Sequence, residues 1–150
     1  MRFFLIDKIQ DWQVGRSAEA IKNVALSEDY FDDHYPRHPV MPGVLILEGI
    51  AQLSGLLLED SLKERYGHSA KAIMAVVERT KFRDIVRPGE TLVYRTEVLS
   101  LNLQGGKTIA QASRNGKVVV STGMTFAFKP VDDPQFEIKR DALMKIWMAL

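Results

Sequence analysis

The stretch from Val44 to Leu58 constrains the fold most, because its fifteen residues include only three polar side chains, Glu48, Gln52 and Ser54. It is shorter than the roughly 20 apolar residues that span a bilayer, and it contains a carboxylate. Pro42 suits a first helical turn, where its missing N–H is no loss, so we predict a helix over about residues 42–60. The polar residues 59–65 are expected to carry this helix into solvent. A helix that is apolar on nearly every side must be enclosed by other structure.

The enclosing structure is predicted to be β, because polar and apolar residues alternate through much of the second half of the chain. The alternation covers Thr91–Leu101, Lys107–Arg114 and Lys117–Phe128, and period two is typical of half-buried strands. Gly105-Gly106 and Asn115-Gly116 separate these segments. Both dipeptides favour tight hairpin turns, so the three strands should pair antiparallel.

Three further segments, Phe3–Ile9, Ala18–Val24 and Ala72–Val77, are weaker strand candidates. The predicted fold class is therefore α+β, with a long antiparallel sheet curled around one buried helix. We expect residues 1–129 to form this domain. Residues 130–150 should form a C-terminal extension with a short amphipathic helix, because apolar residues recur there at helical spacing: Leu143, Met144, Trp147 and Leu150.

Composition excludes several classes of function. Twenty Lys and Arg against nineteen Asp and Glu leave a net charge of +1, without the concentrated excess that a nucleic-acid-binding face needs. The chain has no cysteine, so any chemistry must use oxygen and nitrogen groups. Asp7 interrupts the first apolar residues before they reach the length of an export signal. A cytoplasmic location is therefore expected.

The segment that carries chemistry lies directly before and within the predicted helix. Three prolines stiffen the loop from His34 to Pro42 and exclude helix there, so His34 is held rigidly, as a general base should be. Gly43 falls in the first helical turn, where unpaired N–H groups point along the positive end of the helix dipole. These groups could stabilise a carbonyl oxygen that gains negative charge.

Glu48 lies among Leu, Ile and Val residues, where desolvation favours the protonated carboxylic acid. An acid of this kind beside the His34 imidazole forms an acid/base pair. Gln52 follows one turn later on the same helix face and could orient the carboxyl group. In an arbitrary buried helix, Glu48 and Gln52 could equally do no more than satisfy one another's hydrogen bonds.

His34 and His38 have the spacing of a possible metal pair, but that spacing aligns ligands only on a helix, which Pro36 and Pro39 exclude. We therefore expect no metal and no cofactor.

The sequence from His34 to Gln52, HYPRHPVMPGVLILEGIAQ, resembles the signature segment of the bacterial 3-hydroxyacyl-acyl carrier protein dehydratases. The resemblance extends to Phe4–Ile9, Lys81–Arg83 and Arg87–Glu90, and covers about Phe3–Phe128. It implies the hot-dog fold, in which a sheet wraps around a long helix. That implication agrees with the pattern of the residues.

The resemblance also implies dehydration of a 3-hydroxyacyl thioester to the trans-2-enoyl thioester. His34 would remove the C2 proton, Glu48 would protonate the departing hydroxyl, and the Gly43 N–H would hold the thioester carbonyl. A Glu at position 48, where the bifunctional dehydratase/isomerases have Asp, favours dehydration alone. The implied assembly is a homodimer, extendable to a trimer of dimers, whose sites combine His34 of one subunit with Glu48 and Gly43 of the other.

An acidic acyl carrier protein is the implied partner, and Lys81, Arg83 and Arg87 are candidates for steering it. Alternatively, these three residues form only a solvent-exposed face with no role in binding. Asp33 stands where the family usually has Gly. Two other functions stay open at this point: a hot-dog thioesterase, since the same fold hosts thioester hydrolysis, and a non-catalytic acyl-binding subunit.

Overall fold

The computed structural model describes residues 3–149. The chain forms six strands, two α-helices and one short 3₁₀ helix within this range, and their bounds are β1 (Lys8–Gln13), β2 (Ser17–Asn23), η1 (Asp29–Asp32), α1 (Gly43–Tyr66), β3 (Ala70–Phe82), β4 (Thr91–Leu101), β5 (Gly105–Arg114), β6 (Lys117–Pro130) and α2 (Pro134–Met148).

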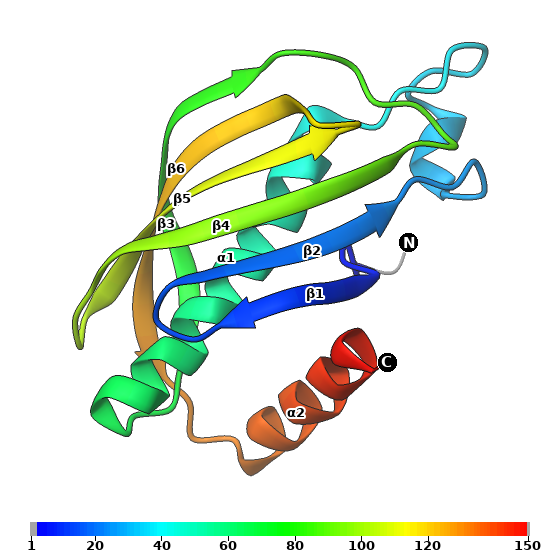
Figure 1. Cartoon of the computed structure of the whole chain (residues 1–150). Coiled ribbons are helices and arrows are strands. Elements are labelled where there is room, and N and C mark those ends of the chain that lie inside the picture. Colours follow the sequence, from blue (N-terminus) through cyan, green and yellow to red (C-terminus); the bar gives the residue numbers. More distant parts are fainter. Residues whose placement is uncertain (1–2, 150) are drawn as a thin grey trace.

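The strands form a single antiparallel sheet in the order β1-β2-β4-β5-β6-β3. Figure 1 shows the sheet curving around α1, with α2 beside β1 and the lower part of α1. The predicted α+β class, a long antiparallel sheet around a central helix, is confirmed. Strand β3 pairs only with β6 in this sheet, so no strand within residues 3–149 covers its other edge.

The sheet approaches α1 closely where the helix has glycine. Tyr94 of β4 is fully buried under Gly49, and a side chain at position 49 would overlap the Tyr94 hydroxyl. Leu53, Leu57 and Leu58 continue the buried face of the helix and are fully buried. The apolar run identified from the sequence is thus the centre of the core.

Helix α1 is longer than predicted, because it ends at Tyr66 rather than near residue 60. Gly67 stops it in the left-handed conformation, with φ of 71°. The prediction that the polar residues 59–65 turn into solvent is wrong at Glu59 and Ser61, which are buried. Glu59 can be buried because Arg140 of α2 pairs with it.

The first strand also begins later than predicted, at Lys8 instead of Phe3. The residues before it are tied to α1 through the Gln52 side chain. Its Oε1 accepts from the Leu5 N–H at 3.1 Å, and its Nε2 donates to the Phe3 carbonyl at 2.9 Å. These bonds hold the N-terminal segment against the helix, outside the sheet.

Helix α2 is anchored on the same side of the molecule. Trp147 is buried and its indole Nε1 donates to the Ile6 carbonyl at 2.7 Å, while Asp133 caps the first turn by accepting from the Gln135 N–H. Leu150, which the helical spacing included, lies outside the described residues. Neither α2 nor any other helix within residues 3–149 is long and apolar enough to cross a membrane.

Candidate active site

The loop before α1 presents His34 from a closed hydrogen-bonded turn. The His34 N–H donates to the Tyr30 carbonyl at 3.2 Å, and the Val40 N–H donates to the His34 carbonyl at 2.9 Å. The imidazole stacks on the Tyr35 ring, with 4.3 Å between the ring centroids. The proline-rich loop therefore fixes both the backbone and the ring of His34.

The same turn determines which ring nitrogen of His34 is basic. Nδ1 lies 2.7 Å from the Val40 carbonyl oxygen, and a carbonyl oxygen can only accept a hydrogen bond. Nδ1 must therefore carry a proton, which leaves the lone pair of the neutral ring on Nε2. Nε2 is the nitrogen that can take a proton from a substrate.

His34 and Gly43 line one cavity of about 310 Å³, together with Phe82 and Ile85 from the end of β3 and the loop after it. Helix α1 begins at Gly43, so the amide there belongs to the first turn, which intrahelical bonds leave unpaired. A Cβ at this glycine would lie 2.7 Å from the Phe82 ring. The missing side chain therefore admits the Phe82 ring, a contact that local sequence did not indicate.

Glu48 and Gln52 line a different, larger cavity of about 440 Å³. Glu48 is five residues beyond Gly43, which on a helix turns its side chain by roughly 140° around the axis. Gln52 Nε2 donates to Glu48 Oε1 at 3.4 Å and is bonded more closely to the N-terminal segment. Within one chain, the candidate base and the candidate acid thus face different cavities.

Arg114 of β5 holds the loop that forms part of the His34 cavity. Its guanidinium donates to the Asp84 carboxylate at 2.6 Å and to the Ile85 carbonyl at 2.5 Å, and it pairs with Glu90 at 2.9 Å. The hydrogen bond with Arg114 lowers the pKa of Asp84 below its usual range, and the same bond raises the pKa of Arg114. Sequence reasoning missed this contact, because 30 residues separate Arg114 from Asp84.

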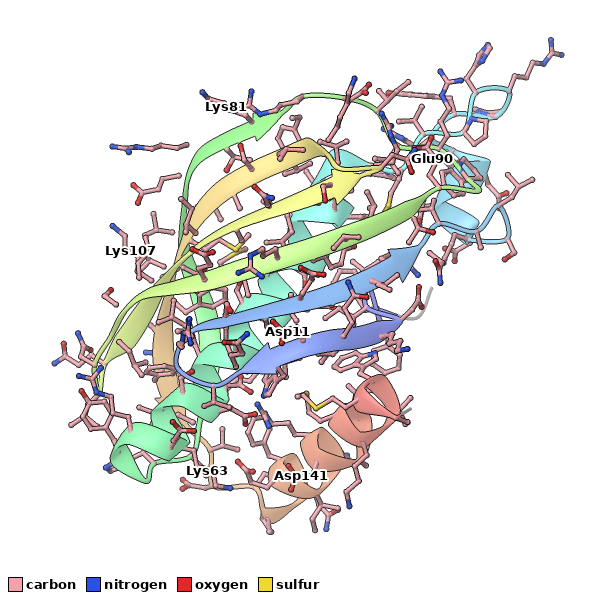
Figure 2. The ribbon with its side chains drawn as sticks, in the orientation of Figure 1. Asp11, Lys63, Lys81, Glu90, Lys107 and Asp141 are labelled. Carbon is pink, nitrogen blue, oxygen red and sulfur yellow. The ribbon has the colours of Figure 1, made fainter. Side chains whose placement is uncertain are left out.

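The three basic candidates, Lys81, Arg83 and Arg87, are exposed. Figure 2 shows Lys81 near the end of β3. Phe82 and Asp84, the immediate neighbours of Arg83, line the His34 cavity. Lys81, Arg83 and Arg87 themselves do not line this cavity, and Lys81 and Arg83 adjoin residues in sequence that do.

The acidic residue that replaces the usual glycine, Asp33, is exposed at the end of η1. Its φ of −108° is in a region open to any residue, so this backbone does not require glycine.

Comparison with known proteins decides which family this arrangement represents. The model of the FabA-like domain matches residues 1–123. The 3-hydroxyacyl-[acyl-carrier-protein] dehydratase FabZ of Caldicellulosiruptor bescii is 39% identical over 127 residues, covering 85% of this chain and 89% of the relative. This chain belongs to the FabA-like dehydratase family. FabZ proteins of Halalkalibacterium halodurans and Chlamydia muridarum are 37% and 39% identical.

Solved structures support the fold of this family member. The dehydratase heterocomplex ApeI:P from Xenorhabdus doucetiae superposes with a TM-score of 0.68 at 15% identity, over 91% of this chain and 90% of the other. Protein smu.793 from Streptococcus mutans, bound to acetyl CoA, gives 0.68 at 13% identity, over 89% and 96%. The predicted hot-dog fold is confirmed.

Proposed function

We propose that this chain dehydrates a 3-hydroxyacyl thioester, carried by acyl carrier protein, to the trans-2-enoyl thioester in fatty acid or related acyl-chain biosynthesis in the cytoplasm. The observation that carries the proposal is His34, whose Nδ1 is bonded to the Val40 carbonyl and whose Nε2 is thereby left as a base. The FabZ relatives support the substrate class and the carrier.

In the proposed reaction, His34 Nε2 takes the proton from C2, and the C2–H electron pair forms the C2–C3 double bond. The C3 hydroxyl leaves as water after it takes a proton from Glu48. Negative charge that develops on the thioester oxygen is held by the Gly43 N–H, at the positive end of α1. One proton passes from histidine to glutamate to reset the site, so no cofactor and no metal is required.

The proposed site is shared between two copies of the chain. His34 and Gly43 line one cavity and Glu48 and Gln52 line another, so we assign the first pair to one subunit and the second pair to its partner. Gln52 has the role of orienting Glu48. The resemblance implied that Gly43 acts together with Glu48 of its own subunit. We assign Gly43 to the His34 subunit instead, because these two residues line the same cavity within one chain.

The free edge of β3 supports a second copy as the partner. Four apolar side chains on this strand are 37–47% exposed, namely Ile73, Met74, Val76 and Val77. A long, apolar and unpaired edge strand favours association with another strand. We propose a two-fold homodimer through β3, from which a trimer of dimers could form.

A single assay separates dehydration from thioester hydrolysis. The chain is incubated with a 3-hydroxyacyl thioester of acyl carrier protein while enoyl-thioester absorbance and free thiol are followed together. We expect enoyl product without thiol release. Thiol release would instead identify a thioesterase, and no reaction over several chain lengths would favour a non-catalytic acyl-binding subunit.

The carrier protein is proposed to approach over Lys81, Arg83 and Arg87. Reversing these charges should raise KM for the carrier-bound substrate and reduce its salt sensitivity, while a short thioester mimic is little affected. Lys129→Glu is the matched control, because Lys129 is exposed and lies opposite Lys71 in the β3–β6 ladder, at the other end of β3 from Lys81. Equal effects on both substrates would remove these residues from carrier binding.

A further inference from the structure

The cavity beside Glu48 is an elongated apolar space along α1. Its volume of about 440 Å³ is within the range of small-molecule sites. One wall is a stripe of α1 side chains, in which Ala51 and Gly55 leave room: Glu48, Ala51, Gln52, Gly55, Leu56 and Glu59. The stripe extends for roughly 16 Å, since Glu59 follows Glu48 by eleven positions at about 1.5 Å each. This shape suits an extended acyl chain of medium length.

The far end of this cavity is charged. Glu59 and Lys71 line it there, and the Glu59 side chain is only 4% exposed. An alkyl chain gains nothing by displacing the partners of a buried carboxylate, because an unpaired buried charge is costly. The apolar part of the cavity therefore has a defined end.

Helix α2 supplies the outer wall through Leu143 and Trp147. The matching FabA-like domain model ends at residue 123, whereas α2 begins at Pro134. The wall is therefore contributed by a segment beyond the part of the chain that matches the family model.

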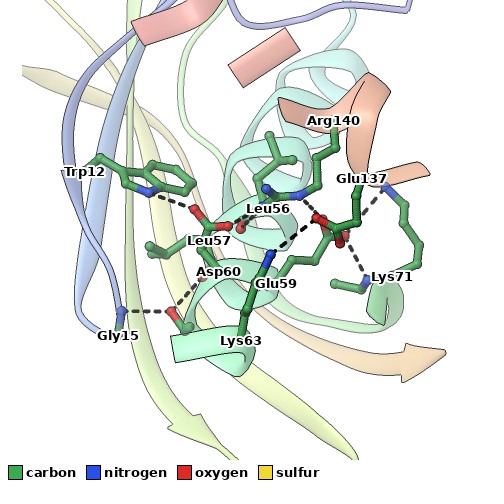
Figure 3. A network of polar contacts seen from close by, with 12 residues as sticks. Trp12, Gly15, Leu56, Leu57, Glu59, Asp60, Lys63, Lys71, Glu137 and Arg140 are labelled. Atoms are coloured by element: carbon green, nitrogen blue, oxygen red, sulfur yellow. Dashed lines mark hydrogen bonds and ion pairs between the residues drawn. The ribbon is translucent and has the colours of Figure 1, made fainter. Parts of the chain in front are cut away.

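This wall is fixed in place at several points. Arg140 of α2 donates to Glu59 at 2.8 Å and to the Leu56 carbonyl at 2.9 Å, and pairs with Asp60 at 2.9 Å. Figure 3 shows the Arg140 side chain reaching from α2 to these groups on α1. Together with the bond from the Trp147 indole to the Ile6 carbonyl, these contacts anchor α2, which carries Leu143, on both sides of that residue.

We propose that α2 is the specificity wall of the acyl site: Leu143 and Trp147 enclose the side of the cavity along which a longer acyl chain would run from Glu48 toward the end at Glu59. This inference rests on the proposed dehydratase function. It adds a substrate-selecting role for the C-terminal helix.

The test enlarges Leu143, which is half-buried and faces the cavity. Ile146→Trp is the matched control, because Ile146 lies on the same helix and is 70% exposed. Turnover is measured with 3-hydroxybutanoyl and 3-hydroxydodecanoyl thioesters of pantetheine. Binding of the unreactive dodecanoyl thioester is measured separately by calorimetry, and the mass of the assembly by sedimentation.

We expect Leu143→Trp to lower kcat/KM for the dodecanoyl substrate about tenfold or more and to weaken binding of the dodecanoyl thioester similarly, since a filled apolar pocket discriminates by this order. The butanoyl substrate and the Ile146→Trp variant should be unaffected. Equal losses on both chain lengths, no loss, or the same loss in Ile146→Trp would overturn the proposal. A changed assembly mass in Leu143→Trp would also overturn it, by showing that a second copy occupies the cavity.

If the wild-type chain turns over neither substrate, the proposed dehydratase function fails, and the binding measurement alone then decides the role of α2. Weaker dodecanoyl binding in Leu143→Trp, but not in Ile146→Trp, would still support the wall. Unchanged binding would refute it.

Discussion

Replacing Arg140 with Met tests how α2 is held against the body of the protein. The side chains of Arg140 and Glu59 are 10% and 4% exposed, and their charged atoms lie 2.8 Å apart. Burial by itself would lower the pKa of Arg140, but the hydrogen bond with Glu59 and the charge of Asp60 raise it, so the guanidinium stays charged. Met keeps much of the aliphatic volume and removes only the charge and its hydrogen bonds.

The loss of stability in Arg140→Met depends on which partners Glu59 keeps in this variant. Removing one partner of a buried ion pair costs about 3–5 kcal/mol, because the other charge is left uncompensated. Glu59 still accepts from the Ala72 N–H at 2.9 Å and has Lys71 at 3.6 Å. We therefore expect a loss near the lower end, about 3 kcal/mol of unfolding free energy.

Urea unfolding at a fixed protein concentration measures this loss. With a slope of about 2 kcal/mol per molar urea, the midpoint should fall by about 1.5 M. The control is Lys63→Met, which removes an exposed pair with Glu137 at 3.7 Å and should cost less than about 1 kcal/mol.

A double-mutant cycle with Glu59→Gln should give a coupling energy of at least about 1.5 kcal/mol, because both changes remove the same interaction. Additive losses, or an equal midpoint shift in Lys63→Met, would refute the view that Arg140 neutralises a buried carboxylate.

Three further outcomes are expected. Gly49→Ala should cost about 1–3 kcal/mol of unfolding free energy, because the added methyl group would overpack against Tyr94. Gly55→Ala in the same helix meets only ordinary contacts, so it should be neutral or stabilising. Comparable losses of stability in thermal unfolding of the two variants would contradict this. The hydrogen bond with Arg114 lowers the pKa of Asp84 in the folded state, so the ionised carboxylate stabilises the fold above the ordinary aspartate pKa of about 3.8, and this stabilisation is lost as pH falls through the lowered pKa. Asp84→Asn should therefore lower the urea midpoint of unfolding relative to wild type at neutral pH, and this difference should vanish in acid. A difference that does not change with pH would show that ionisation of Asp84 does not stabilise the fold. Chelators should leave turnover unchanged, and loss of activity with recovery on adding zinc would show a metal requirement.

The regular elements were largely predictable from the sequence, because their signals are local. The alternation of polar and apolar residues predicted the central strands, and the predicted segment Thr91–Leu101 has the same bounds as β4. The prolines around His34 correctly indicated a stiff loop, as its closed hydrogen bonds show. In each case neighbouring residues decide the conformation.

The errors occurred where a distant partner decides the outcome. Glu59 sits at the start of a polar run and was predicted to be exposed, but Arg140, 81 residues later, makes its burial possible. Two other contacts join segments far apart in the chain. The Phe82 ring packs over Gly43, and Arg114 binds Asp84 in the loop after β3.

One feature of the site could have been anticipated from spacing alone. Glu48 follows Gly43 by five positions on the helix, which separates the two groups by roughly 140° around its axis. They could not both face a small substrate within one chain.

The most direct test of the shared site mixes two inactive variants. His34→Ala and Glu48→Gln should each lower turnover by at least about 10²-fold, as expected for positioned proton-transfer groups. When equal amounts exchange subunits, half of the dimers are mixed, and each mixed dimer has one intact site of two. The shared site predicts recovery of roughly a quarter of wild-type activity. Mixtures that demonstrably exchange subunits yet stay as inactive as the parents would contradict it.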